Sequence, residues 1–443
     1  MADARPFHWE YRPEAAAPEA FRIEGGTPLR GTVAVSGAKN AALKLLAAAV
    51  LTGERCRFEN VPEIEDVRVM CEVLTDLGVV VEHPAPGVYE VAAGDVDWLF
   101  IPLEAAAKMR ASFILLGPLL ARFGRVIISN PGGDRIGRRP VNLHVDAMRA
   151  LGADVEYRNG YYYAQAPGRL RGAAVRFPQV TVMGTENAML AATLADGHTL
   201  IRPAAQEPEV DDLIAFLCEM GADVQRTFPD TIEIHGTRRL RGATHTVVPD
   251  RIETGTFLVA AAVTGGKLTL ENAACDHVGA LTDIFARVGL PVRCEGSRLE
   301  IDATGLRPGD LRGLDIETAP YPGLATDLQP PTCVLLTQAA GESRVHEAVF
   351  DDRIEWLAEL RKLGATVDIQ DAHHAVIHGP ARLHGAEATI GDLRAGASLI
   401  LAALAADGTS LIHGAHHVHR GYENIDRKFQ QLGATITRSA DTA

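Results

Sequence analysis

A tripeptide that recurs at regular spacing constrains the fold of this chain more than any other feature. The pattern Leu-x-Gly begins at Leu29, Leu170, Leu240, Leu311 and Leu383, and the last three spacings are 70, 71 and 72 residues. The gap of 141 residues that follows the first copy equals two periods, so a further unit, which has lost the tripeptide, is expected to begin near residue 97. A period of this length indicates six repeated structural units.

Each unit shows the same order of strand-like and helix-like segments. The first unit reads as a strand (TVAVS), an apolar helix (AALKLLAAAVLT), a strand (RCRFENV), an amphipathic helix (EIEDVRVMCEVLTDLG) and a hairpin (VVVEH, VYEVA). A helix that is apolar on every side must be buried on every side, whereas the second helix has period 3.6 and ends at glycine. We therefore predict an α/β fold of β-α-β-α-β-β units in two domains of three, with helices inside, sheet outside and a ligand cleft between the domains.

Charge and composition limit the partners and the compartment. The formal net charge of −14 argues against nucleic acid or an anionic membrane as a partner. The six cysteines are scattered, which suits free thiols in a reducing compartment. The first twenty residues lack the basic start and apolar stretch of a signal peptide, and the apolar segment 397–406 is too short to span a bilayer. We expect a soluble, cytoplasmic protein with a disordered extension over residues 1–20.

Charged residues stand where the buried helices should begin, although the scaffold itself needs only small or apolar residues there. The cations and Asn40 are suited to bind an anion, because a helix N-terminus offers unpaired N–H groups and a positive dipole. Capping or ion pairing between units is the structural alternative for each residue taken singly. The charged residues at these places are Lys39, Arg110, Glu186, Glu253, Asp327 and Arg394.

Two further segments carry unusual residues. The stretch PGGDRIGRRPVNLH (131–144) combines the adjacent Gly132 and Gly133 with Arg135, Arg138 and Arg139. This suits a mobile lid over a phosphate-bearing ligand, with a solvated basic turn as the alternative. HHVHRG (416–421) contains His416, His417 and His419, but their spacing along a helix does not bring a third histidine or an acidic ligand to the same face. We therefore expect no metal there. Glycine-rich nucleotide signatures are absent from the sequence, which excludes Rossmann and P-loop sites.

Five segments resemble a known family: SGAKNAAL, DRIETGTFLVAAA, ATDLQPP, GDLRAGASL and HRGYENID are similar to signatures of the UDP-N-acetylglucosamine 1-carboxyvinyltransferases. The similarity runs from about Phe21 to Ile436. It implies the inside-out α/β barrel of the enolpyruvyl transferases, with one domain at 39–248 and another formed by 21–38 plus 249–443.

The resemblance also implies a reaction. Phosphoenolpyruvate would join the 3-hydroxyl of UDP-N-acetylglucosamine by addition and elimination, with release of phosphate and without a metal or organic cofactor. This is the first committed step of peptidoglycan synthesis, and so serves cell wall biogenesis, cell shape and division. The two substrates would be the partners, and we expect a monomer or a weak homo-oligomer.

The motifs shared with the family imply roles for individual residues of this chain. Lys39, Arg139 and Arg420 would hold phosphoenolpyruvate, supported by Arg110 and Arg394. Asp327 would take the proton of the sugar hydroxyl, a task that partial burial would favour by raising its pKa. Asp134 would deliver a proton, and Lys39 and Arg420 would act beside the two acids. The UDP-sugar would contact Asn40, Asp66, Arg110, Arg139, His144, Thr181, Val182, Asp250 and Asp327.

Asp134 is one of several departures from the family pattern. Most members have cysteine there, and a carboxylate is a far poorer nucleophile toward the epoxide fosfomycin. We predict activity that is insensitive to fosfomycin, whereas Asp134→Cys should create sensitivity in an inactivation assay. Rapid alkylation of the unchanged protein would contradict this.

Three other departures concern the acceptor. Gln179 and Met183 replace residues that are frequent in the diphosphate region, and Gln206 replaces a usual arginine before Glu207, which leaves UMP as an alternative acceptor. Shikimate 3-phosphate is a further alternative, although enzymes of that type resemble this sequence less. A non-catalytic protein that binds an anionic sugar is a further alternative. Such a protein would need the cations but neither Asp134 nor Asp327.

Overall fold

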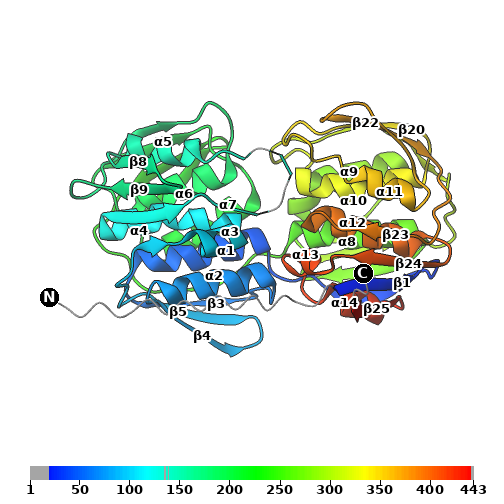
Figure 1. Cartoon of the computed structure of the whole chain (residues 1–443), viewed down its shortest axis with the longest axis horizontal. Helices are drawn as coiled ribbons and strands as arrows, with labels where there is room; N and C mark the ends of the chain where they lie inside the picture. Colours follow the sequence, from blue (N-terminus) through cyan, green and yellow to red (C-terminus); the bar gives the residue numbers. More distant parts are fainter. Residues whose placement is uncertain (1–18, 134–135, 138, 441–443) are drawn as a thin grey trace.

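The computed structural model describes residues 19–133, 136–137 and 139–440, and they form two lobes that lie side by side (Figure 1). Each lobe encloses a hydrophobic core of its own. One core is drawn from residues 38–247, and the other from residues 21–35 and 252–436. We call these the first lobe and the second lobe.

In both lobes the helices lie inside and the sheets outside (Figure 1). The alanine- and leucine-rich helices predicted to be buried are buried on all sides; in α8 (Arg251–Thr264) every residue up to Ala262 is buried. The amphipathic helices keep a charged face in solvent. The predicted inside-out α/β architecture, with three units in each lobe, is confirmed.

Three sheets surround the first lobe. They are β14 (Thr244–Thr246), β3 (Arg55–Glu59), β5 (Val88–Ala92) and β4 (Val80–Ala85); β6 (Phe100–Ile101), β7 (Arg125–Ser129), β9 (Tyr161–Gln165) and β8 (Asp154–Arg158); and β10 (Ala174–Arg176), β11 (His198–Arg202), β13 (Thr231–His235) and β12 (Asp223–Phe228). The helices are α1 (Lys39–Ala48) with η1 (Ala49–Leu51), α2 (Glu65–Asp76), α3 (Leu103–Lys108), η2 (Arg110–Leu115), α4 (Leu116–Phe123), α5 (Asn142–Ala150), α6 (Val182–Thr193) and α7 (Pro208–Glu219).

The second lobe repeats this plan. Its sheets are β16 (Arg293–Glu295), β17 (Arg298–Asp302), β15 (Lys267–Glu271) and β2 (Arg30–Ala34); β18 (Leu311–Arg312), β20 (Ala339–His346), β22 (His374–Gly379) and β21 (Thr366–Ile369), with β19 (Ile316–Glu317) beside β20; and β23 (Glu387–Thr389), β24 (Thr409–His413), β1 (Glu19–Glu24) and β25 (Thr435–Ala440). Besides α8, its helices are η3 (Cys275–Val278), α9 (Gly279–Val288), η4 (Thr326–Leu328), α10 (Gln329–Thr337), α11 (Leu357–Lys362), α12 (Leu393–Ala405), α13 (His416–His419) and α14 (Ile425–Gln431).

Strand exchange joins the two lobes. β2 opens the first unit in the sequence, yet it pairs in parallel with β15 of the second lobe, with Thr32 opposite Thr269. Its place in the first lobe is taken by β14, which pairs with β3 with Thr244 opposite Arg57. β1 lies between β24 and β25 in the second lobe. The chain therefore crosses between the lobes twice, near residues 36–38 and 248–250.

The two crossing segments lie against each other. Ala38 N donates to Val248 O at 2.7 Å, and Asp250 N donates to Ser36 O at 2.8 Å. Because each crossing runs directly into a buried helix, α1 in one lobe and α8 in the other, both helices begin at the junction of the lobes.

The start of the chain and the second unit differ from expectation. β1 begins at Glu19, and Ala20 is fully buried, so the ordered part starts before residue 21. In the second unit an additional helix, α3, precedes the buried segment that was expected to begin at Arg110, and Met109 between them adopts an extended backbone. Arg110 therefore stands at the start of a new helical segment.

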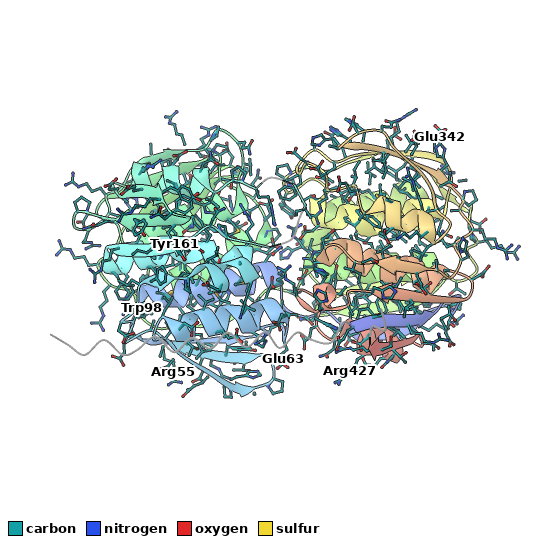
Figure 2. All side chains as sticks on the ribbon, in the orientation of Figure 1. Arg55, Glu63, Trp98, Tyr161, Glu342 and Arg427 are labelled. Atoms are coloured by element: carbon teal, nitrogen blue, oxygen red, sulfur yellow. The ribbon has the colours of Figure 1, made fainter. Side chains whose placement is uncertain are left out.

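The sheets present their outer faces to solvent. Figure 2 shows Arg55 of β3 and Glu342 of β20 on this outer surface, and both are exposed. Within the described parts of the chain, no helix has both the length and the apolar character that a bilayer crossing requires.

Candidate active site

A buried carboxylate links two predicted site cations at the junction of the lobes. The Asp66 side chain contacts Lys39 Nζ at 2.8 Å and Arg420 Nε at 2.9 Å. Burial alone would raise the pKa of Asp66, but Lys39 and Arg420 outweigh it and lower the pKa. Lys39 starts α1 and Asp66 lies in α2, whereas Arg420 follows α13, so this cluster joins the two lobes. Asp66 was predicted to contact sugar, and here it holds two cations.

The proposed base forms a second cluster. Asp327 accepts from Arg394 Nε at 3.1 Å and from Arg353 Nη2 at 3.0 Å, and both arginine side chains are buried. Burial alone would raise the pKa of Asp327, but Arg394, Arg353 and Lys39 outweigh it and hold the pKa well below its usual range. The expectation that burial would make this carboxyl more basic is wrong for this state of the protein, because the neighbouring cations dominate.

The two clusters adjoin. The charge of Lys39 acts on Asp327, and the charge of Asp250 acts on Arg394. Asp250 lies at the second crossing, where one of its oxygens accepts from Ile252 N and Glu253 N to cap α8 and the other accepts from Lys39 N at 3.2 Å. Asp250, predicted to contact the UDP-sugar, therefore fixes the starts of α8 and α1.

Arg110 and Arg139 place two more cations together in the first lobe. Arg110 Nη2 donates to the carbonyl oxygens of Arg139 and Pro140. Burial, followed by repulsion from Arg139, lowers the pKa of Arg110 to about 10. Two adjacent guanidinium groups gain from an anion between them, because it removes their mutual repulsion.

The loop at 131–140 reaches the second lobe. Gly137 has φ 96°, and a Cβ on it would lie 2.1 Å from the carbonyl oxygen of Asp351. Only glycine fits this approach. The predicted proton donor Asp134, together with Arg135 and Arg138, lies outside the described residues.

The remaining predicted sugar contacts are spread over three helices. Asn40 stands in the first turn of α1 and is partly exposed, while Thr181 caps α6 by accepting from Gly184 N, with Val182 as the first helical residue. His144 is buried, 3.1 Å from Asn187 Nδ2. Burial, assisted by Arg110, lowers the pKa of His144 to about 3, so the imidazole is neutral.

Two of the acids noted at helix starts have structural partners. Glu253 contacts Lys428 at 2.5 Å, and Glu186 is fully buried 3.6 Å from Lys44. Across residues 19–133, 136–137 and 139–440, three or more His, Cys, Asp or Glu side chains nowhere gather in a way that suits a metal ion. The charged groups that the structure brings together at this site are lysine and arginine cations and carboxylates.

Comparison with known proteins identifies relatives over nearly the whole chain. The family model described as EPSP synthase (3-phosphoshikimate 1-carboxyvinyltransferase) matches residues 23–429. The chain belongs to this family. Among its relatives, the UDP-N-acetylglucosamine 1-carboxyvinyltransferase of Paramagnetospirillum magneticum is 42% identical over 96% of this chain and 99% of its own length. The protein of the same name from Caulobacter vibrioides is 45% identical, over 95% and 98%.

Solved structures give the same fold. The enolpyruvyl transferase NikO from Streptomyces tendae superposes with a TM-score of 0.86 at 26% identity, covering 96% of this chain and 99% of its own. An EPSP synthase from Acinetobacter baumannii superposes with a TM-score of 0.73 at 21% identity, covering 95% and 100%. The second likeness concerns the fold alone.

Two residues of this EPSP synthase family member were missed from the sequence. Arg353 holds Asp327 as closely as Arg394 does, yet it lies in a stretch without a repeat signature, before α11. Its buried position is the only sign of its role, since no motif marks it. Arg251 was missed as well; it contacts Glu209 of the first lobe at 2.9 Å, and both side chains are buried.

Proposed function

We propose that this enolpyruvyl transferase moves the enolpyruvyl group of phosphoenolpyruvate to the 3-hydroxyl of UDP-N-acetylglucosamine and releases phosphate. One observation carries the proposal. At the junction of the lobes Asp66 holds Lys39 and Arg420, and the charge of Lys39 also acts on Asp327. The choice of acceptor rests on relatives named UDP-N-acetylglucosamine 1-carboxyvinyltransferase, which match nearly the full chain at more than 40% identity.

The cations suit the donor substrate. Phosphoenolpyruvate carries a phosphate and a carboxylate, and guanidinium groups bind both in bidentate fashion. Lys39 and Arg420 would face the phosphate, since the proposed reaction breaks the bond to this group. Arg394 would take the carboxylate, and Arg110 with Arg139 would close the anion site. An already assembled set of cations stabilises the negative charge that develops on the leaving phosphate.

Asp327 would act as the base once the donor is bound. In this structure its pKa is low because Arg394 and Arg353 neutralise it. A substrate anion on Arg394 shares that guanidinium and adds negative charge beside the carboxylate, which raises the pKa of Asp327. The carboxylate then accepts the proton of the hydroxyl as its oxygen attacks C2, while an acid protonates the methylene carbon. Loss of a methyl proton and of phosphate from the tetrahedral adduct completes the transfer.

Phosphate release from phosphoenolpyruvate tests the proposal directly. UDP-N-acetylglucosamine, UMP and shikimate 3-phosphate would be offered separately at equal concentrations. We expect kcat/KM to be highest with UDP-N-acetylglucosamine. Higher kcat/KM with UMP would reassign the acceptor, in line with Gln179, Met183 and Gln206. No release with any of the three would reject the transferase reaction for this chain.

A further inference from the structure

A cavity of about 470 Å³ opens at the end of the first lobe that lies away from the junction. It lies among residues that end buried helices or precede strands, and four of its eleven lining residues are arginines. The lining residues are Leu51, Thr52, Gly53, Glu54, Ala121, Arg122, Arg169, Leu194, Arg238, Arg239 and Leu240. Its volume falls in the range of small-molecule sites.

The three helices that frame this cavity also carry the candidate active site. Lys39 begins α1, which η1 continues to Leu51 at the cavity. η2 begins at Arg110 and runs through α4 past Ala121, and α6 runs from Val182 to the Leu194 cap. At 1.5 Å per residue, the two ends of α1 with η1 lie roughly 20 Å apart. The cavity therefore faces away from the reaction chemistry.

Two of the arginines, Arg122 and Arg169, mainly form hydrogen bonds within the protein. Arg122 donates through Nη1 to the carbonyl oxygens of Val50, Thr52 and Ala93, each at 2.8 Å. Arg169 donates to Leu194 O at 2.6 Å and Thr237 O at 2.7 Å. These bonds satisfy the carbonyl groups that helix ends leave open and offset the negative ends of the helix dipoles. The cavity wall can therefore accept an anion, which the helix C-termini would repel without these two arginines.

The other two arginines are available. Arg238 is exposed and makes no hydrogen bond or ion pair with the described residues. Arg239 is 83% exposed and contacts Glu54, the only acidic residue that lines the cavity. Such an exposed pair contributes little to stability and can be exchanged for a ligand anion.

The repeat itself provides a comparison. Arg169 and Arg239 stand directly before the Leu-x-Gly tripeptides of the first lobe, whereas Pro28, Asp310 and Arg382 hold this position in the second lobe. Arg382 pairs with Asp407 in the second lobe, just as Arg169 pairs with Asp196 at 3.2 Å in the first, so the difference between the lobes lies in Arg238 and Arg239. The scaffold does not require arginine at this position, and on a chain with a net charge of −14 a cluster of four is unusual.

We propose that this cavity is a second anion site, which binds a small metabolite carrying two or more phosphate or carboxylate groups. Arg238 and Arg239 contact the ligand, and Arg122 and Arg169 provide the positively charged floor. Bidentate contacts from guanidinium groups suit both kinds of anion.

Calorimetric titration of the full chain with inorganic pyrophosphate, and separately with citrate, tests the site and distinguishes phosphate from carboxylate ligands. The test variant is Arg238→Ala/Arg239→Ala. The matched control is Arg382→Ala, which removes an exposed arginine from the corresponding repeat position of the second lobe. Thermal unfolding without ligand shows that all proteins are folded.

The active-site cations also attract anions, so the decisive quantity is the difference between the variants. We expect a binding component in the unchanged protein and in Arg382→Ala that is at least about tenfold weaker in Arg238→Ala/Arg239→Ala for one or both probes. Replacement of both residues by lysine should recover part of it, because charge is retained. Identical isotherms for all proteins, or no binding beyond the active site, would overturn the proposal.

Discussion

The two lobes are built from the same repeated unit, but the residues that precede several of their buried helices differ. In the second lobe, Asp250 caps α8 and Asp392 caps α12 through side-chain oxygens that accept backbone N–H groups. In the first lobe, Ala38 before α1 and Met109 before η2 provide no side-chain cap, although Thr181 caps α6 and Asp250 of the second crossing accepts from Lys39 N. Acidic caps stabilise a helix start, whereas uncapped starts beside cations remain suited to bind an anion. The proposed base thus comes from the second lobe, while both lobes supply cations, Lys39 and Arg110 from the first and Arg394 and Arg420 from the second.

The strongest test of this division is Asp327→Asn, which removes the base and preserves the shape of the side chain. Turnover should fall by about 10²–10⁴-fold, the usual contribution of a general base. Phosphate release measures it, and Asp315→Asn, at an exposed ion pair with Arg344, is the control. A variant that keeps more than about a tenth of the activity would show that the second lobe does not supply the base.

The Asp66 cluster tests the connection between the lobes. Asp66→Asn leaves Lys39 and Arg420 without their carboxylate in a buried place, so the free energy of unfolding should fall by about 3–5 kcal/mol. Urea unfolding measures this change. Asp371→Asn, at an exposed pair with His374, should change it by less than about 0.5 kcal/mol. Equal effects would mean that the cluster adds nothing to the contact between the lobes.

His144 gives the first lobe a pH dependence. Its pKa of about 3 in the folded protein lies below the ordinary value of 6.5, so the unfolded chain binds the proton more tightly. The stability that the neutral imidazole contributes is complete above pH 6.5, and it decreases by about 1.4 kcal/mol per pH unit as the pH falls toward 3. In urea unfolding between about pH 7 and 5, His144→Gln should lack this contribution to the slope. An unchanged slope would contradict the assignment.

The smallest effect concerns the caps themselves. Asp392→Ala removes the acceptor for Arg394 N and Ala395 N, and should cost about 1 kcal/mol of stability. Asp392→Asn retains an acceptor, so its cost should be lower. If both variants lose the same stability in denaturant unfolding, the charge of Asp392 rather than its hydrogen bonds stabilises α12.

The sequence predicted most of the architecture because the helices repeat a strong local signal. Continuous apolar segments at a period near 71 residues can only be buried helices, and the sheets must then lie outside them. Which strand completes which sheet is a different matter, because pairing is set by contacts far apart in the chain. β2 carries the same local pattern wherever it pairs, so nothing local indicated its place beside β15.

The site, too, could be predicted from the sequence only where local motifs mark its residues. Lys39, Asp327 and Arg394 stand in distinctive motifs at helix starts, and the structure brings the three side chains close together. Arg353 has no motif, and it reaches Asp327 only because the chain before α11 folds back over η4. The pKa of Asp327 was misjudged for the same reason, since its direction depends on cations that only the tertiary structure brings together.

The exchange of strands also affects how the chain folds during synthesis. Residues 39–248 contain every strand of the three first-lobe sheets, so this lobe can close as soon as β14 is available. β2 leaves the ribosome before that lobe but pairs with β15 after it. At roughly 5–20 residues per second, β2 waits about 10–50 s for its partner, and β1 waits longer for β24 and β25. The second lobe is therefore both the first and the last part of the protein to be made, and its earliest strands remain exposed edges until nearly the whole chain has been translated.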